Sequence, residues 1–412
     1  MTYKMPVTHI SHSSHSTALI NRRSFLAGAG GVALSNLLMG CSGQDRQTLS
    51  LQVLNGSIPP QIVGEYRKHL RQAAIAGSLE IAIEPQLQSA FNGLQAWVRN
   101  GQADADASDR FGWLPLIGKR SKPIPDLVTI GNYWLEKAVQ QGLVQPLDLK
   151  SLSGWQALPP AWKAMATRAS ATKPTEQQLW GAPYRGGNTV IAYRQDIFKE
   201  KGLPPPTDWS DLWRSDLRGH ISLLDQPREV IGLTLKKLGQ SYNTANLETV
   251  PTLQAELTAL NQQVKLYSSD AYMHPMLLGD TWLAVGWSTD LLPLTQRNQT
   301  LAVVVPKSGT ALWAELWVRP AVATAALPSL AADWISFCWR SEIASQLSLM
   351  SRAMSPVVLT TPVANLPIEL RQNPVLLPDA ATQAASEFLK PLDRATVLQY
   401  QALWQRLRQV NG

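Results

Sequence analysis

The sequence predicts an α/β protein with two lobes, and three observations support this. Short apolar segments alternate with longer amphipathic ones, which is typical of β-α units in a parallel sheet. The alternation occurs in two successive series, over 49–141 and 190–287. About 370 residues follow the first forty, which is more than one hydrophobic core usually serves. Open α/β sheets bind ligands at the carboxyl ends of their strands, so we expect a site in the cleft between the lobes.

The first series begins with a strand over 49–54 and an amphipathic helix over 59–76. In that helix Ile62, Tyr66 and Leu70 recur at helical spacing, which predicts a buried face. We then expect, in order, a strand over 79–85, a helix over 87–100, a buried strand over 126–130 and a helix over 133–141.

The second series predicts strands over 190–194, 220–225, 264–268 and 282–287, with helices over 208–213, 227–239 and 247–263 between them. From Ser329 onward the pattern is helical almost throughout.

The first forty residues have the features of an export signal. The apolar run Phe25–Met39 is about 15 residues long, where a membrane-spanning helix needs roughly 20. Arg22 and Arg23 with the following Ser-Phe-Leu resemble a twin-arginine signal, and the Leu-Met-Gly-Cys that ends at Cys41 resembles a bacterial lipobox. We therefore expect cleavage before Cys41 and a lipid on Cys41 that tethers the protein to the outer face of a membrane. The alternative is an ordinary secretory signal with Cys41 unmodified.

The charge of the chain argues against nucleic-acid binding, and its cysteine content argues against a disulfide. The formal net charge is +7, and Lys4, Arg22 and Arg23 of the signal contribute three of these charges. We find no basic run with interleaved aromatic residues, which argues against nucleic-acid binding. Cys338 has no second cysteine once Cys41 is lipidated, so we expect a buried helical residue and no disulfide.

The chain carries no recognisable catalytic or metal-binding motif. His69, His220 and His274 lack ligand spacing, and GxSxG and P-loop patterns are missing. Gly28–Gly31 lies inside the export signal. The acidic segment 102–110 lacks the glycine and the terminal acid of a calcium loop, so a solvated surface loop is expected there. These observations predict a protein that is not an enzyme and needs no cofactor or metal.

Three sequence blocks resemble the spermidine/putrescine-binding branch of bacterial solute-binding proteins, the extracytoplasmic receptors of ABC importers. The blocks span 125–148, 180–239 and 282–320, and the tail over 386–404 extends the similarity. The resemblance implies a two-lobed periplasmic-binding fold of type II, with two interlobe crossings near 183–188 and 313–318. It also implies closure around one small molecule, presentation to a membrane permease, and a monomer.

On this basis the chain divides into four parts. Residues 1–40 form the signal peptide and 41–48 a linker. Lobe 1 comprises 49–185 plus 316–355, and lobe 2 comprises 186–315 plus 356–412.

Two candidate ligand contacts lie in the segment that opens the helix over 227–239. Pro227 suits the first helical position, which makes Gln226 the N-cap and Glu229 the third helical residue. Glu229 then either faces the cleft and meets a ligand amine or reaches back to the Gln226 backbone in a capping box. The resemblance implies acids at both positions, and Gln226 replaces one of them.

Further candidates come from three other strands. Trp313 and Glu315 are two residues apart and so point to one side of an extended segment, while Trp287 ends a strand. An indole face beside a carboxylate suits an ammonium group. Packing between sheet and helix is the better explanation of each tryptophan taken alone. The resemblance reverses this preference and implies that Trp287, Trp313 and Glu315 contact ligand, together with Asn132 and Tyr133.

The sequence departs from the polyamine-binding pattern at several positions. Leu54, Ser57 and Ala353 stand where the resemblance implies aromatic residues. Arg185, near the first crossing, either binds an anion through its guanidinium or forms a surface or interlobe ion pair. We therefore expect a polyamine or similar small organic amine, with an anionic or zwitterionic solute as the alternative. An exported enzyme or an anchored scaffold on the same fold are the alternatives from other classes.

Overall fold

The computed structural model describes residues 47–111, 123–170, 175–323 and 326–409, without the side chains of 102–111. The export signal, Cys41 and most of the predicted linker therefore lie outside the described residues. Among the residues that are described, no helix has both the length and the apolar character to cross a membrane.

The first predicted series forms parallel β-α units. The strands are β1 (Gln47–Leu54), β2 (Gly77–Glu84) and β3 (Leu127–Gly131), and β1 pairs in parallel with both of the others. The helices are α1 (Pro60–Gln72), α2 (Leu87–Phe111) and α3 (Asn132–Gln140). Ile62, Tyr66 and Leu70 are the buried residues of α1, as their spacing predicts.

The acidic segment 102–110 is not the loop that we expected. Helix α2 continues through it to Phe111. Ala103, Ala105 and Ala107 alternate with its polar residues, and alanine is the best helix former, so the segment prolongs the helix.

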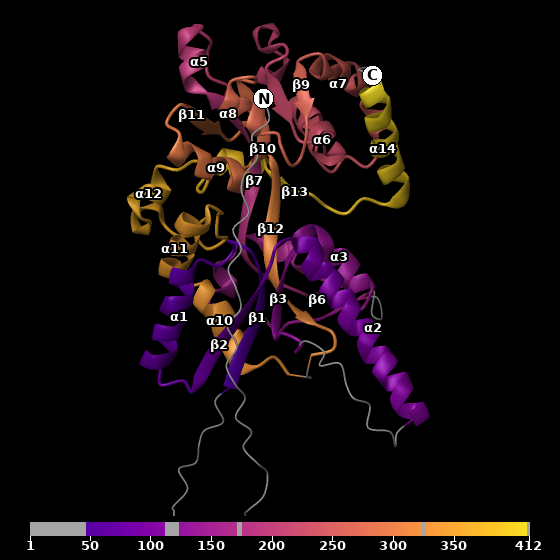
Figure 1. Ribbon diagram of the computed structural model, residues 1–412, viewed down its shortest axis with the longest axis vertical. Helices are drawn as coiled ribbons and strands as arrows, with labels where there is room; N and C mark the ends of the chain where they lie inside the picture. The colour runs from indigo at the N-terminus through magenta and orange to yellow at the C-terminus, as the bar shows by residue number, and fades with distance from the viewer. Residues whose placement is uncertain (1–46, 112–122, 171–174, 324–325, 410–412) are drawn as a thin grey trace, which may run out of the picture. The chain divides into compact units, whose positions relative to one another are not determined.

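Two long antiparallel strands, β7 (Ala182–Arg194) and β12 (Ala311–Pro320), lie side by side in the middle of the sheet (Figure 1). Residues 182–188 of β7 pair with β12, whereas residues 189–194 pair with β10 (Leu283–Trp287) and β11 (Leu301–Val304). The pairing partner changes between Asn188 and Thr189, at the end of the first predicted crossing. In the other long strand, Leu312–Val318 pair with β3 and β7, and this segment includes the second predicted crossing, 313–318.

The second series completes the other half of the sheet with β8 (Ile221–Leu223) and β9 (Val264–Tyr267). Over the described residues the 11-stranded sheet has the order β2-β1-β3-β12-β7-β10-β8-β9. The short strands β4 (Val144–Gln145) and β13 (Glu387–Phe388) pair with β12, and β5 (Thr167–Ala169) and β6 (Gln177–Leu179) form a separate hairpin. The sheet is therefore mixed rather than wholly parallel.

The helices of this half include α5 (Gln195–Glu200), α6 (Pro227–Lys237), α8 (His274–Leu278) and α9 (Ser288–Arg297). The helix predicted over 208–213 is the 3₁₀ helix η2 (Trp209–Trp213). The helix predicted over 247–263 is interrupted: a 3₁₀ turn, η4 (Leu247–Thr249), precedes α7 (Leu253–Asn261). Pro251 explains the break, because a proline disfavours helical geometry in the residue before it.

The tail is mainly helical, as predicted, and comprises α10 (Ser329–Cys338), α11 (Ser341–Ser351), α12 (Ile368–Arg371), α13 (Ala380–Ala385) and α14 (Arg394–Gln409). Cys338 is fully buried in α10, which confirms the prediction for it. Tyr400, Leu403 and Leu407 of α14 join the hydrophobic cluster that contains Leu233 of α6 and Leu257 of α7.

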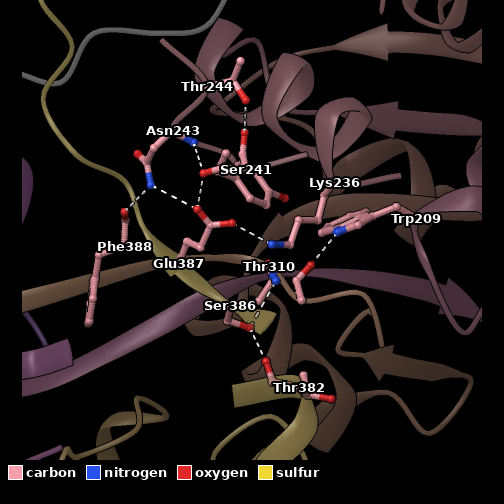
Figure 2. Close-up of polar contacts among 12 residues, drawn as sticks. Trp209, Lys236, Ser241, Asn243, Thr244, Thr310, Thr382, Ser386, Glu387 and Phe388 are labelled. Atoms are coloured by element: carbon pink, nitrogen blue, oxygen red, sulfur yellow. Dashed lines mark hydrogen bonds and ion pairs between the residues drawn. The ribbon is translucent and has the colours of Figure 1, made fainter. Parts of the chain in front are cut away.

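The segment before α14 is held against α6 by polar contacts (Figure 2). Glu387 accepts a hydrogen bond from Lys236 Nζ at 2.6 Å, and Asn243 donates to the Phe388 carbonyl at 3.0 Å. Gly309, whose φ is +89°, lies against the backbone of Ala385, so a side chain there would be strained and would clash. These contacts place Leu389 beside Leu312, near the start of β12.

Candidate functional site

One cavity of about 550 Å³ collects most of the residues that the sequence singles out. It is lined by the start of α3, by α6 and by the central strands β7, β10 and β12. Seven of the eight predicted ligand contacts line it: Asn132, Tyr133, Arg185, Glu229, Trp287, Trp313 and Glu315. A wider hollow of about 800 Å³ adjoins it, since Asn132 and Leu389 line both.

Gln226 does not join this group. It is the N-cap of α6, is exposed to solvent, and is not among the residues that line the cavity. The helix begins where Pro227 predicts, but its first turn directs only Glu229 toward the cavity.

Asn132 and Tyr133 begin α3 directly after strand β3. The Asn132 side chain accepts a hydrogen bond from the Ala314 backbone N–H at 2.9 Å and so joins α3 to β12. Tyr133 is 54% exposed at the edge of the cavity and packs edge-on against Trp134. Asn132 is therefore fixed by the fold, whereas Tyr133 is free to meet a solute.

Trp313 and Glu315 point to the same side of β12, as their spacing predicts, and Trp287 ends β10 beside them. Gly187 of β7 allows this arrangement, because a Cβ at that position would lie 2.4 Å from the Trp313 indole. The close approach of β7 to an aromatic side chain on β12 thus requires glycine.

Glu315 is already paired with a cation of the protein itself. Arg185 donates from Nη2 to Glu315 Oε1 at 2.5 Å, and the Tyr184 hydroxyl donates to Oε2 at 2.6 Å. Arg185 and Glu315 are 5% and 1% exposed. Burial opposes the charge of Arg185, but the adjacent carboxylate outweighs it and raises the pKa of the guanidinium. Arg185 therefore forms an ion pair, as one of its two interpretations held, but the pair is buried and does not lie at the surface.

Glu229 stands in a different environment. The Thr189 hydroxyl donates to Glu229 Oε2 at 2.9 Å, and the residue is 7% exposed. Its side chain is directed to β7 and the cavity rather than back to the Gln226 backbone, so the capping-box interpretation is wrong. Burial raises the pKa of Glu229, against the hydrogen bonds from Thr189 and Trp287 and the charge of Arg228.

The sequence did not single out the apolar remainder of the wall as ligand contacts. Leu87, Trp134, Leu312 and Leu389 line the cavity, together with Leu54, which replaces an expected aromatic residue. Leu87 and Trp134 lie in the first turns of helices that follow strands. Because open α/β sheets bind ligands at the carboxyl ends of their strands, these two positions could have been identified from the sequence. Leu389 carries no such signal, because only the folding of the tail brings it there.

The site shows no obvious metal chemistry. Among the described residues, no three His, Cys, Asp or Glu side chains gather as they would around a metal ion. The cavity combines one buried ion pair, one separate carboxylate and several indole and aliphatic groups. Such a set can enclose a small organic cation through charge and cation-π contacts.

Comparison with known proteins confirms the resemblance seen in the sequence blocks. Residues 122–382 match the family described as bacterial extracellular solute-binding protein. The chain belongs to this family. Membership implies an extracytoplasmic location.

Two curated relatives carry names that state a ligand. The spermidine/putrescine-binding periplasmic proteins of Salmonella typhimurium and Escherichia coli are each 27% identical over 284 residues, covering 69% of this chain and 77% of theirs. Both are named as binding proteins, not as enzymes.

Solved structures show the same fold. The spermidine/putrescine substrate-binding protein of Streptococcus pneumoniae has a TM-score of 0.70 and 20% identity, over 88% of this chain and 99% of that one. A Treponema pallidum lipoprotein has a TM-score of 0.60 and 16% identity over the same shares. The solute-binding protein described here therefore has the two-lobed periplasmic-binding fold.

Proposed function

We propose that this solute-binding protein is the receptor of an ABC importer, that it holds a small organic amine in the 550 Å³ cavity, and that it delivers the amine to a permease. The observation that carries the proposal is Glu229, a buried carboxylate beside the Trp287 indole at the cavity wall. A carboxylate beside an indole face suits an ammonium group. The names of the curated relatives, which bind spermidine and putrescine, support the same chemistry.

We further propose that the lobes divide as the sequence suggests, with 49–185 plus 316–355 in one and 186–315 plus 356–412 in the other. The change of β7 partners between Asn188 and Thr189 supports the first boundary. The packing of α14 on α6 and α7 supports the assignment of the tail to the second lobe. A ligand that touches both lobes would then favour the closed form.

Export by the twin-arginine route and a lipid on Cys41 are part of the proposal. A lipid anchor raises the effective concentration of a receptor at its permease, so anchoring would favour delivery of the ligand. The Cys41→Ser protein is expected in the soluble extracytoplasmic fraction, whereas the unaltered protein sediments with membranes. Equal distribution of the two proteins would contradict lipid anchoring.

The test of the function is a thermal-denaturation screen of the purified protein with small amines, amino acids and organic anions. A ligand at a hundred times its Kd stabilises a protein by about 2.7 kcal/mol, which shifts the melting curve visibly. We expect at least one amine to do so, and Glu229→Gln to abolish the shift. Glu369→Gln, an exposed acid on α12, is the matched control and keeps it.

Other outcomes would select the alternatives. Stabilisation by anions or zwitterions but by no amine would replace the amine proposal with a different solute. Turnover of a bound compound would indicate an enzyme. If no amine, amino acid or organic anion stabilises the protein, a scaffold is favoured.

A further inference from the structure

The charges around the cavity limit what kind of amine it can hold. Among the described residues, the charged side chains that line it are Arg185, Glu229 and Glu315. We propose that the cavity selects an amine with a single positive charge and an apolar body, and discriminates against diamines and triamines. This inference rests on the proposed function, because it concerns the same site.

Glu315 offers no net charge to a ligand, because Arg185 neutralises it. Its carboxylate lies 2.5 Å from Arg185 Nη2 and also accepts the Tyr184 hydroxyl. The pair is almost inaccessible, with side-chain exposures of 6% and 2%. A ligand ammonium beside Glu315 would meet the buried guanidinium as well, and like charges at such separations repel strongly where water is excluded.

Glu229, in contrast, can pair with the charge of a ligand. In the part of the chain that the structure describes, no cation forms an ion pair with it. Arg228, its neighbour in sequence, donates instead to the carbonyls of Lys390 and Tyr242 and to the Asn243 side chain, and its guanidinium lies over the Tyr400 ring. Glu229 is therefore the position where one ammonium group gains a full opposite charge.

The other side chains that line the cavity are mostly apolar. Leu54, Leu87, Trp134, Leu312 and Leu389 give it a mainly apolar character. An ammonium group buried against such a surface loses its hydration without gaining a carboxylate, which is costly. A methyl or methylene group at the same place gains from burial. The far end of the ligand should accordingly be apolar.

A matched trio of ligands tests the inference by calorimetry on the purified protein. n-Pentylamine and 1,4-diaminobutane have equal length and differ only in whether the second end is a methyl or an ammonium group. 4-Aminobutanoate carries a carboxylate there instead. We expect n-pentylamine to bind at least about tenfold more tightly than either of the others.

The outcomes separate the inference from the function. If 1,4-diaminobutane binds as tightly as n-pentylamine or more tightly, the inference is overturned while the amine-receptor function stands. Tightest binding of 4-aminobutanoate overturns the inference and replaces the amine with a zwitterion. If no compound of the trio binds and no compound of the thermal-denaturation screen stabilises the protein, both the proposed function and the inference are wrong.

A variant tests the cause of the selectivity. Arg185→Gln removes the guanidinium and leaves Glu315 as a second free carboxylate, so we expect the affinity for 1,4-diaminobutane to rise at least about tenfold relative to n-pentylamine. Arg214→Gln, which breaks a surface ion pair with Asp216, is the control and leaves the ratio unchanged. An unchanged ratio in Arg185→Gln would contradict the role given to the ion pair. If this variant does not fold, the ligand trio on the unaltered protein still decides the selectivity.

Discussion

Glu229 of α6 and Glu315 of β12 line the same cavity, and both are almost completely buried. Their immediate partners differ. Glu315 receives a guanidinium from Arg185 and a hydroxyl from Tyr184, whereas Glu229 receives a hydroxyl from Thr189. Two residues of one type, in one cavity, thus present different charges to a solute.

The number of acids is therefore not enough to infer the charge of a binding site. A buried carboxylate beside a guanidinium contributes mainly to the fold, because separating the two leaves an unpaired charge in a region of low dielectric. A buried carboxyl group bonded only to neutral groups forms no ion pair within the protein, so the positive charge of a ligand can pair with it. Three variants test this difference, ordered from the largest expected effect on stability.

The first is Glu315→Gln, which leaves Arg185 charged and buried without its carboxylate. Removing one partner of a buried ion pair typically costs about 3–5 kcal/mol. We expect a loss of this size in the free energy of unfolding, measured by chemical denaturation. A loss as small as that of the exposed control Glu369→Gln would mean that the pair does not support the fold.

The second is Tyr184→Phe, which keeps the ring and removes the hydroxyl that donates to Glu315. A hydrogen bond to a charged group contributes about 1.5–3 kcal/mol, so the expected loss is smaller than that of Glu315→Gln. The same denaturation experiment measures it. Equal stability of Tyr184→Phe and the unaltered protein would show that Arg185 alone holds the carboxylate.

The third is Glu229→Gln. Here the pH dependence of the free energy of unfolding is more informative than the size of its change at one pH. Burial raises the pKa of Glu229 above its ordinary value of 4.5, so the folded state binds this proton more tightly than the unfolded state. The carboxyl group therefore stabilises the fold below pH 4.5, and this contribution is lost as the pH rises through the raised pKa.

Glutamine does not titrate, and it can still accept the Thr189 hydrogen bond. The unaltered protein should consequently lose stability relative to Glu229→Gln as the pH rises above 4.5. Denaturation of both proteins across this pH interval measures the difference. A difference of the opposite sign would place Glu229 beside a cation and would remove the contrast with Glu315.

Much of the fold could be predicted because its signals are local. The spacing of Ile62, Tyr66 and Leu70 identifies the buried face of α1, and Pro227 identifies the first residue of α6. The failures have local causes as well. The alanines among 102–110 support helix where the acids suggested a loop, and Pro251 divides a segment whose apolar periodicity is otherwise continuous.

The candidate site could be predicted only in part. Asn132, Trp287 and Trp313 were identified because residues at strand ends and on one face of a strand fall together when the sheet forms. Gln226 was included on its position in the helix cap, but its side chain is exposed and lies off the cavity. Leu389 was missed, because a contact made by the tail with a distant sheet leaves no periodic trace in the sequence.

The α/β class, the order of most elements and the residue types around the cavity follow from local signals in the chain, since periodicity, caps and glycines act over a few neighbouring residues. The charge of the site depends on the three-dimensional fold. Arg185 and Glu315 are 130 residues apart in the chain, and they meet because β7 and β12 pair in one particular register. Electrostatic energy depends on distance in space, which no local pattern encodes.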